Sequence, residues 1–450
     1  MRITVENFGP IREAKDIRIS PLTMFVGPSN SGKSYLAAVI NSVIEAASES
    51  FVDPLPEIDG SEIKDAEAKR FFMGWAKSMQ QIWKGRIAYY LGEEGENIAK
   101  SRSMRVIMYS DDDDIVIDLC QPQKSRISKT HLNNLVARAG KKQVEYRIDY
   151  SPSVKIFIRL AEELCVELFG NEWVRSYYLP AVRGAVMQSY RAIVDQSIRR
   201  ASEFGTRHGN TSSMFSGIFG DFTRRLIDID KKEKGGKEII AINKILESNI
   251  LHGRINVIFP DIGLPEFRYV VKGKKGDMAI NNVSASVAEL APLSVFMRYY
   301  LNPRNLLIWE EPEMNLYPQA QRDIADIMVR LANAGVLVLA TTHSDIVLEQ
   351  IDNAYRASQL KDAGKDRRLL GDHEPLDTSK ELAVYSFIES SKGTKVEKVE
   401  KVDFGHMTEA MTKYYLDAVQ SLYNQTVRSA NSENNEQATN DGKKTVSGKV

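Results

Sequence analysis

The stretch Gly27–Ser34 constrains the fold of this 450-residue chain more than any other feature of the sequence. It has the pattern G-x-x-x-x-G-K-S, with an apolar run, Leu22–Val26, before it and apolar residues at helical spacing from Leu36 onward. Glycines let main-chain N–H groups curl around phosphate oxygens, a lysine reaches the β- and γ-phosphates, and a serine hydroxyl can hold Mg²⁺. The pattern predicts a strand, a phosphate-binding loop and a helix, a context that argues against a glycine-rich turn that binds nothing. The predicted nucleotide-binding residues of the loop are Gly27, Pro28, Ser29, Asn30, Ser31, Gly32, Lys33 and Ser34.

Two carboxylates follow a second apolar run far downstream. The predicted strand Leu306–Trp309 ends in Glu310 and Glu311. In a parallel sheet the carboxyl end of a strand faces the ligand crevice, where one carboxylate can hold Mg²⁺ and the next can take the proton of an attacking water. We assign Glu310, together with Ser34, to the metal and Glu311 to the base. The alternative is an exposed acidic loop containing a proline, which the phosphate-binding loop makes less attractive.

A histidine follows the next predicted strand, Val336–Ala340. The strand ends in Thr341-Thr342-His343-Ser344, which places these polar side chains at the same crevice. A lone histidine is more often structural, but this position favours a catalytic role for His343, in contact with the γ-phosphate or the attacking water. Lys33, Glu311 and His343 are therefore the predicted catalytic residues.

The rest of the chain predicts an α/β fold with insertions. Further strands are expected at Arg2–Val5, Asp16–Ile19, Arg105–Tyr109, Ile115–Leu119, Val174–Leu179, Ile255–Phe259, Phe267–Val271, Met278–Val283 and Leu382–Ile388. Further helices are expected at Phe72–Leu91, Val154–Phe169, Ala181–Ala201, Ser286–Tyr300, Gln319–Ala334 and Thr408–Tyr423. Periodicity does not decide between helix and strand for Lys395–Val402. The predicted segments are a core part (1–50), an insertion (51–173), a core segment (174–201), a helical insertion (202–253), a second core part (254–428) and a disordered tail (429–450).

The order of these motifs resembles ABC-type ATPases, namely the SMC-, RecF- and OLD-like AAA ATPases of DNA repair and phage defence. Three further stretches carry the resemblance: the opening Val5–Ile11, the segment Glu311–Pro318 after the paired carboxylates, and Tyr178–Gly184, which contains Leu-Pro-Ala-x-Arg. It covers roughly residues 1–50 and 174–425 and leaves the insertion at 51–170 uncovered.

The resemblance implies a P-loop NTPase fold of the ABC or SMC-head type, with a mixed sheet flanked by helices and with α+β and helical insertions. It also implies ATP with Mg²⁺ as ligand and cofactor, and a homodimer or higher homo-oligomer formed on ATP. Arg183 becomes a candidate nucleotide sensor, with structural pairing as an equal alternative.

The signature segment departs from the family pattern. Ser284 matches the serine that caps the nucleotide of the opposite subunit, but Ala285 and Ser286 stand where small residues and glycine are expected. Ser286 with Glu289 three residues later predicts a capping box at the helix start. This departure keeps a second hypothesis open, a weakly hydrolysing scaffold or sensor switch. A membrane-transporter ATPase subunit is a weaker third hypothesis, because the large insertion and the Phe-Gly-Pro opening favour the repair and defence branch.

Composition sets limits on location and partners. The 60 basic and 60 acidic residues balance, so no global charge attracts nucleic acid, and the 2 cysteines, Cys120 and Cys165, fit a reducing compartment. The N-terminus lacks the apolar core of a secretory signal and no stretch is long enough to span a membrane, so we expect a cytoplasmic protein. No D-x-D pair follows Ser344, and the nearest match is Asp372-His-Glu374, so the nuclease domain of OLD-like proteins is not expected. The effector is then a separate protein, with a nuclease as one candidate and DNA as a further candidate partner.

Two charged runs carry weaker hypotheses. Asp111–Asp114 offers carboxylates for a divalent ion, although a solvated hairpin loop is the simpler interpretation. Lys231–Lys237 offers charge to a phosphate backbone, although such a run with glycines is usually a solvated loop.

Overall fold

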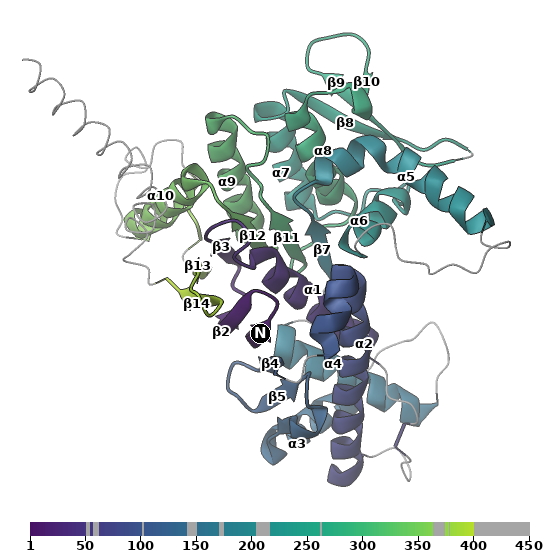
Figure 1. The fold of residues 1–450 in the computed structure, drawn as a ribbon, viewed down its shortest axis with the longest axis vertical. Coiled ribbons are helices and arrows are strands. Elements are labelled where there is room, and N and C mark those ends of the chain that lie inside the picture. Colours follow the sequence, from purple (N-terminus) through teal and green to yellow (C-terminus); the bar gives the residue numbers. More distant parts are fainter. Residues whose placement is uncertain are drawn as a thin grey trace, which may run out of the picture. The chain divides into compact units, whose positions relative to one another are not determined.

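A computed structural model describes residues 1–50, 55–56, 63–100, 103–141, 151–170, 175–203, 217–261, 263–362, 374–377 and 379–399. These residues belong to one folded unit, Met1–Val399 (Figure 1). The predicted helix Thr408–Tyr423, the predicted tail and the end of Lys395–Val402 lie outside the described residues, as does most of Asp372–Glu374.

One large mixed sheet forms the framework of the described residues. In sheet order its strands are β6 (Arg126–Ile127), β5 (Ile115–Asp118), β4 (Arg105–Tyr109), β1 (Arg2–Phe8), β2 (Ile11–Arg18), β14 (Thr394–Lys398), β13 (Leu382–Ile388), β3 (Leu22–Val26), β12 (Leu337–Thr342), β11 (Leu306–Glu310) and β7 (Ser176–Leu179). The block β13-β3-β12-β11-β7 is parallel, whereas β1, β2, β4, β5 and β6 pair antiparallel. The predicted α/β class with a mixed sheet is thus confirmed.

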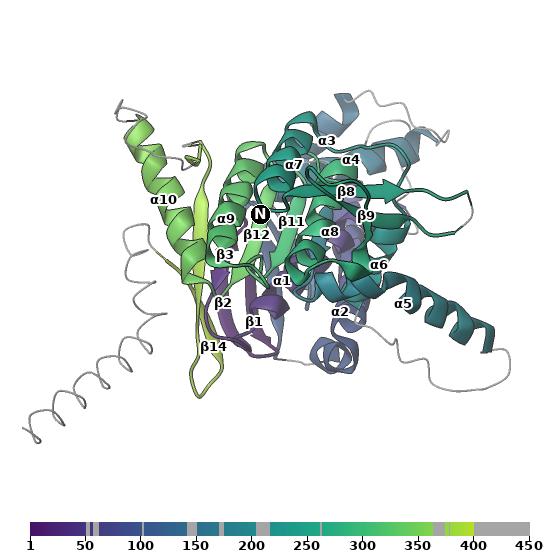
Figure 2. The same cartoon turned by 90° about the horizontal axis from the view of Figure 1, so that it is seen from above.

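Helices cover both faces of the parallel block. The described helices are α1 (Lys33–Glu49), α2 (Asp65–Lys100), α3 (Lys129–Lys141), α4 (Pro152–Phe169), α5 (Arg183–Glu203), α6 (Gly217–Ile227), α7 (Lys237–Asn249), α8 (Ala285–Tyr299), α9 (Pro318–Asn333) and α10 (Asp345–Asp362). Leu306 and Ile308 belong to the buried cluster that α1 and α2 complete, and α9 packs on β3 and β12. Both views show α9 between α7 and α10, and α1 beside α2 (Figures 1 and 2). Because both faces of these parallel strands are covered, consecutive residues are buried, and the strands appear in the sequence as continuous apolar runs.

The segment predicted as an insertion contributes strands to the same sheet. β4 pairs antiparallel with β1, with Ile3 opposite Met108, and β5 and β6 continue the sheet beyond β4. The cluster that contains Phe25 and Leu339 also contains Trp75 and Ile115, so the described part of 51–173 shares the core of the phosphate-binding strand.

The predicted strands and helices are mostly confirmed, with a few corrections. The strand expected over Met278–Val283 stops at Ala279, because Ile280–Asn282 forms a 3₁₀ turn in which Ile280 is buried and two asparagines follow. β10 (Met278–Ala279) joins β9 (Glu266–Val271) and β8 (Gly253–Ile258) in a small separate sheet. Helices α3 and α10 were not anticipated from the sequence.

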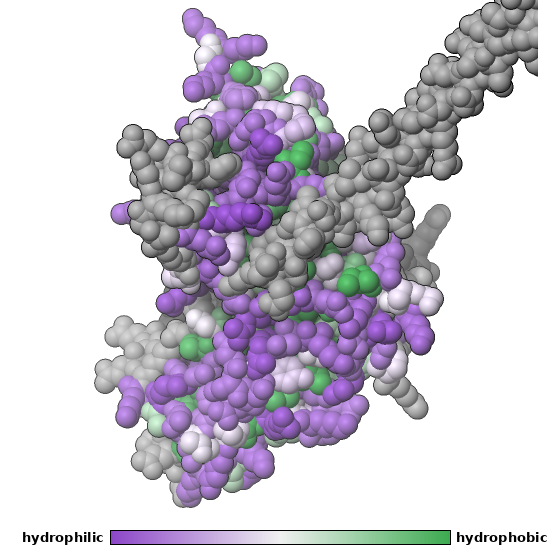
Figure 3. Space-filling view, turned by 90° about the vertical axis from the view of Figure 1, so that its left-hand side faces the viewer, coloured by the Kyte–Doolittle hydropathy of each residue, from purple (hydrophilic) through white to green (hydrophobic). Residues whose placement is uncertain are grey.

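The described residues show neither a membrane-spanning helix nor, on the face drawn in Figure 3, a large apolar surface. No helix there is both long enough and apolar enough to cross a membrane. The coloured part of the face in Figure 3 is mainly hydrophilic, with apolar side chains in small separate patches.

Candidate functional site

The predicted site residues follow three adjacent parallel strands. Val26, the last residue of β3, lies opposite Thr342 of β12, and Thr341 lies opposite Glu310 of β11. The carboxyl ends of these strands therefore bring together the phosphate-binding loop, the paired carboxylates and the Thr-Thr-His-Ser turn. The phosphate-binding loop is about 280 and about 310 residues away in sequence from the other two segments, and the pairing of the strands makes them neighbours.

The phosphate-binding loop connects β3 to α1 in the predicted way. Gly32 has φ 99°, and a Cβ there would come within 2.9 Å of side-chain atoms of Pro10 and Ile11. The Lys33 ammonium is buried and donates to the carbonyl oxygens of Gly27, at 2.9 Å, and Pro28, at 2.6 Å. Burial lowers the pKa of Lys33 to about 8, against the opposing effect of nearby glutamates. The cation thus lies inside the loop, where phosphate oxygens would replace the two carbonyls.

Ser34 and Glu310 lie together, as the predicted metal pair requires. The Glu310 carboxylate accepts a hydrogen bond from the Ser34 hydroxyl, one from Tyr178 at 2.9 Å and one from the Ala181 main chain at 3.2 Å. Burial raises the pKa of Glu310 above its usual range. A serine hydroxyl beside a buried carboxylate is a donor set that fits Mg²⁺, and the metal's charge would stabilise the ionised form.

Glu311 is held in an unusual main-chain conformation. Its φ is 42°, in the left-handed region that non-glycine residues seldom adopt. The Glu311 N–H donates to the Thr341 carbonyl at 2.9 Å, and the Glu311 carboxylate lies 3.7 Å from the His343 ring. The two side chains remain 36% and 30% exposed, so both are accessible to a ligand. Glu311 and His343 thus place a carboxylate and an imidazole side by side at the end of the parallel strands.

Glu313 holds the histidine segment, a role that the sequence analysis missed. One carboxylate oxygen of Glu313 accepts from the Thr342 hydroxyl and from the His343 N–H, each at 2.8 Å. Burial and the neighbouring Lys33 charge lower the pKa of His343 below its usual value, which favours the neutral ring. The Glu-Pro-Glu spacing was visible in the sequence, but the hydrogen bonds to the next strand were not.

Ser284 lies at the exposed N-terminus of α8. Its hydroxyl accepts from the Val287 N–H at 3.5 Å, so Ser284 is the N-cap. The predicted capping box on Ser286 and Glu289 is wrong. Ser286 instead donates to the Asn315 carbonyl at 2.8 Å, and the Glu289 side chain is buried against other partners. The helix starts at Ala285, one residue earlier than predicted. Ser284, which is separated from the 3₁₀ turn Ile280–Asn282 by one residue, occupies the N-cap position in place of Ser286.

Arg183 faces the protein interior. Its side chain is fully buried and donates to the main-chain carbonyls of Pro180, Glu289, Glu310 and Glu311. These contacts favour structural pairing, one of the two interpretations that the sequence left open, over direct nucleotide contact.

The remaining candidates lie elsewhere. Asp112 and Asp114 lie in the β4–β5 hairpin near His131, with ligand atoms within 4.8 Å of one another. Partial burial raises the pKa of the Cys120 thiol to about 11, and full burial raises that of Cys165 to about 12, which favours the unreactive thiol form of both. In the basic loop, Lys234 pairs with Asp230 at 2.6 Å.

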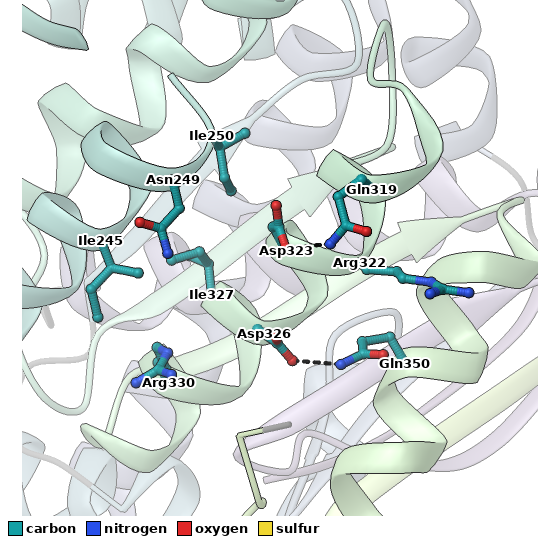
Figure 4. A pocket seen from close by; sticks show the side chains of 10 residues that line it. All are labelled: Ile245, Asn249, Ile250, Gln319, Arg322, Asp323, Asp326, Ile327, Arg330 and Gln350. Carbon is teal, nitrogen blue, oxygen red and sulfur yellow. Dashed lines mark hydrogen bonds between the residues drawn. The ribbon is translucent and has the colours of Figure 1, made fainter. Parts of the chain in front are cut away.

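A pocket of about 400 Å³ lies away from these residues, between α7, α9 and α10 (Figure 4). Gln350 donates to Asp326 across it at 2.8 Å. None of the residues that line it is a predicted site residue, so it is separate from the candidate site. The lining residues are Ile245, Asn249, Ile250, Gln319, Arg322, Asp323, Asp326, Ile327, Arg330 and Gln350.

Comparison with known proteins gives one family match and a set of distant structures. Residues 192–349 match the family described as "AAA domain, putative AbiEii toxin, Type IV TA system", a range that includes Glu310, Glu311 and His343 but not the phosphate-binding loop. No curated protein matches the chain significantly.

The solved structures that match include heads of SMC proteins. An SMC head bound to the C-terminal winged-helix domain of ScpA is 12% identical, covers 89% of this chain and 97% of that chain, and has a TM-score of 0.33. The SMC head domain from Thermotoga maritima is 10% identical, covers 89% and 100%, and has a TM-score of 0.32. An Smc head with a coiled coil and joint from Pyrococcus yayanosii is 10% identical, covers 91% and 98%, and has a TM-score of 0.34.

Proposed function

We propose that this chain, whose residues 192–349 match an AAA-domain family, is a P-loop ATPase of the ABC type that dimerises on ATP and controls a separate partner. The observation that carries the proposal is the meeting of Lys33, the Ser34–Glu310 pair, and Glu311 beside His343 at the ends of adjacent parallel strands. Each side chain has the chemistry that phosphoryl transfer from ATP to water requires.

In the proposed reaction, the site residues bind the phosphates, hold the metal ion and accept the proton of water. Lys33 and the main-chain N–H groups of Gly27–Ser34 bind the β- and γ-phosphates, and Ser34 with Glu310 would hold Mg²⁺, which neutralises developing charge on the phosphates. Glu311 takes the proton of the attacking water, and the neutral His343 ring hydrogen-bonds with the γ-phosphate or that water. Glu313 keeps His343 in place through the main chain.

Dimerisation supplies the last part of the proposed site. Ser284 lies exposed at the N-terminus of α8, where the positive end of the helix dipole favours a phosphate. In the ABC arrangement that the sequence resembles, this helix end meets the nucleotide bound by the opposite subunit. The partner would be a separate effector of DNA repair or phage defence, with a nuclease and DNA as candidates.

The altered signature supports a second candidate, an ATP-dependent scaffold with little turnover. Ala285 and Ser286 replace residues that allow close approach to phosphate, and Ser286 is bound to the Asn315 carbonyl. The intact Glu311 and His343 support hydrolysis instead. The rate of turnover separates the two candidates.

The test is Glu311→Gln, with Glu238→Gln as the matched control on an exposed glutamate in the first turn of α7. Gln keeps the size of the side chain but cannot take a proton, so turnover should stop while ATP binding persists and dimer accumulates. Light scattering with ATP and Mg²⁺ should report twice the monomer mass for Glu311→Gln, and the control should hydrolyse like the wild type. Wild-type turnover in Glu311→Gln would exclude this base, and absent turnover in the wild type with intact ATP binding would favour the scaffold.

A further inference from the structure

The Arg183 guanidinium lies at the junction of three elements: the β7–α5 corner, helix α8 and the end of β11. Its Nη1 donates to the Glu310 carbonyl at 2.7 Å, its Nη2 to the Glu311 carbonyl at 3.2 Å and its Nε to the Glu289 carbonyl at 3.0 Å. The Arg183 side chain is 0% exposed, which is rare for arginine. A buried arginine keeps its charge and requires acceptors around it, so this position is determined by the carbonyls that it joins.

Glu289 completes the junction from the α8 side. Its carboxylate lies 3.4 Å from Arg183 Nε and accepts from the Asn315 side chain at 3.3 Å. A Cβ on Gly184 would come within 2.6 Å of a Glu289 carboxylate oxygen, so the absence of a side chain at Gly184 makes room for this carboxylate. The partners of the carboxylate therefore come from the segment that starts α5, which supplies Arg183 and the Gly184 main chain, and from the turn after Glu311, which supplies Asn315.

The main chain of Glu311 needs such support. Its positive φ is strained for a residue other than glycine and persists only where the surroundings determine it. The Glu311 N–H is held by Thr341 and its carbonyl by Arg183, so both sides of the residue are fixed.

We infer that Arg183 and Glu289 are a positioning pair, which fixes the main chain of Glu311 and connects it to the helix that begins at Ser284. The inference rests on the proposed ATPase function and adds to it a link inside one subunit. Glu311 would act on the subunit's own ATP, whereas the N-terminus of α8 would contact the ATP of the opposite subunit. Closure of one site would thereby be transmitted to the base of the other.

The test replaces both charges together, in Arg183→Met combined with Glu289→Gln. Removal of Arg183 alone would leave a buried carboxylate without its cation, whereas removal of a whole buried pair is often tolerated. The matched control is Arg298→Met with Glu233→Gln. Arg298 is also buried and lies at the other end of α8, where it donates to Glu233 at 2.8 Å and to the Ile255 carbonyl.

The expected result is a loss of kcat with little change in KM. A shift of Glu311 by about 1 Å would lower kcat on the order of 10²-fold, and kcat/KM would fall in proportion because ground-state binding is untouched. Gly184→Ala, which displaces the carboxylate without removing a charge, should lower kcat in the same direction by a smaller factor. The control pair should keep the wild-type kcat at a comparable melting temperature.

Several outcomes would overturn the inference. A test variant with the kcat of the control excludes a positioning role, and a raised KM with unchanged kcat would mean that Arg183 contacts nucleotide directly. If the test pair and Gly184→Ala both fail to fold while the control folds, the junction serves stability alone. If the wild type binds ATP without turnover, or Glu311→Gln hydrolyses normally, the proposed function itself fails, and that result is distinguishable because it does not involve the junction variants.

Discussion

At the scale of single residues, the Lys33 ammonium already lies inside the loop, in the position where it would bind an anion. Its ammonium is buried among loop carbonyls, and its pKa is lowered to about 8 chiefly by that burial. Phosphate oxygens would replace the carbonyls with full negative charge and raise the pKa again. Binding of nucleotide is therefore coupled to the protonation of this side chain.

We predict that ATP affinity decreases as the pH rises above about 8. Above its pKa an increasing fraction of Lys33 is neutral, so binding must take up a proton, and affinity falls by up to about tenfold per pH unit. Calorimetry between pH 7 and 9.5 measures this. Lys33→Arg is the control, because a guanidinium stays charged throughout, and a wild-type affinity as flat as that of Lys33→Arg would contradict the prediction.

Removal of the ammonium should abolish nucleotide binding. In Lys33→Ala the loop N–H groups remain, but they cannot replace a cation between the β- and γ-phosphates. Calorimetry at pH 7 should detect no binding at concentrations that saturate the wild type. An unchanged affinity would contradict the assignment of Gly27–Ser34 as the phosphate-binding loop.

The sequence identified side chains whose position follows from a strand end. Glu310, Glu311 and His343 stand at or just after the end of an apolar run, and Lys33 stands in the loop that follows one, so local order predicted that they face one crevice. The roles of Glu313 and Arg183 depend on partners in other elements. Arg183 and its partner Glu310, for example, are 127 positions apart in the sequence. Contacts at that distance in sequence depend on tertiary packing and have no local signal.

At the scale of elements, the apolar runs predicted which strands exist but not how they are ordered. β14 illustrates the difference, because periodicity left Lys395–Val402 undecided between helix and strand. Pairing with β13 and β2 makes Thr394–Lys398 a strand, an effect of neighbours that no residue pattern records. Helix α8 was predicted nearly to its ends, yet the cap moved from Ser286 to Ser284 because the preceding turn set the helix start.

We predict that ATP-dependent association requires the N-terminus of α8. Ser284→Arg should leave ATP binding by the monomer intact but block dimer closure, because the larger side chain fills the space for the phosphate. Calorimetry and light scattering on the same sample measure the two properties.

A mixture of two variant subunits tests more sharply whether the nucleotide is shared between subunits. Ser284→Arg subunits retain the phosphate-binding loop and Lys33→Ala subunits retain the helix end, so a mixed dimer should contain one complete site and recover part of the turnover. If mixed dimers form but remain as inactive as each parent, the two helix ends do not share a nucleotide, and a monomeric switch is favoured.

At the scale of the whole molecule, the described part of the insertion is built into the same sheet as the site. β4 hydrogen-bonds with β1, and Trp75 and Ile115 lie in the buried cluster that also holds Phe25 of the phosphate-binding strand. The sequence indicated an insertion from its position after the first core segment, but it could not show that the strands inside this segment extend the sheet of the core.

Because of this shared sheet, the free energy needed to open the strands of the insertion should depend on whether nucleotide is bound. Since β4 and β5 depend on the same hydrophobic cluster as β3, their opening is coupled to the opening of the core, and a ligand bound only to the folded state opposes both. At 100 times its dissociation constant, ATP would add about 2.7 kcal/mol to the cost of such opening. Hydrogen exchange should therefore slow in Arg105–Asp118 when ATP is added to the wild type and stay unchanged in Lys33→Ala. Equal exchange with and without bound ATP would mean that this segment opens independently of the core.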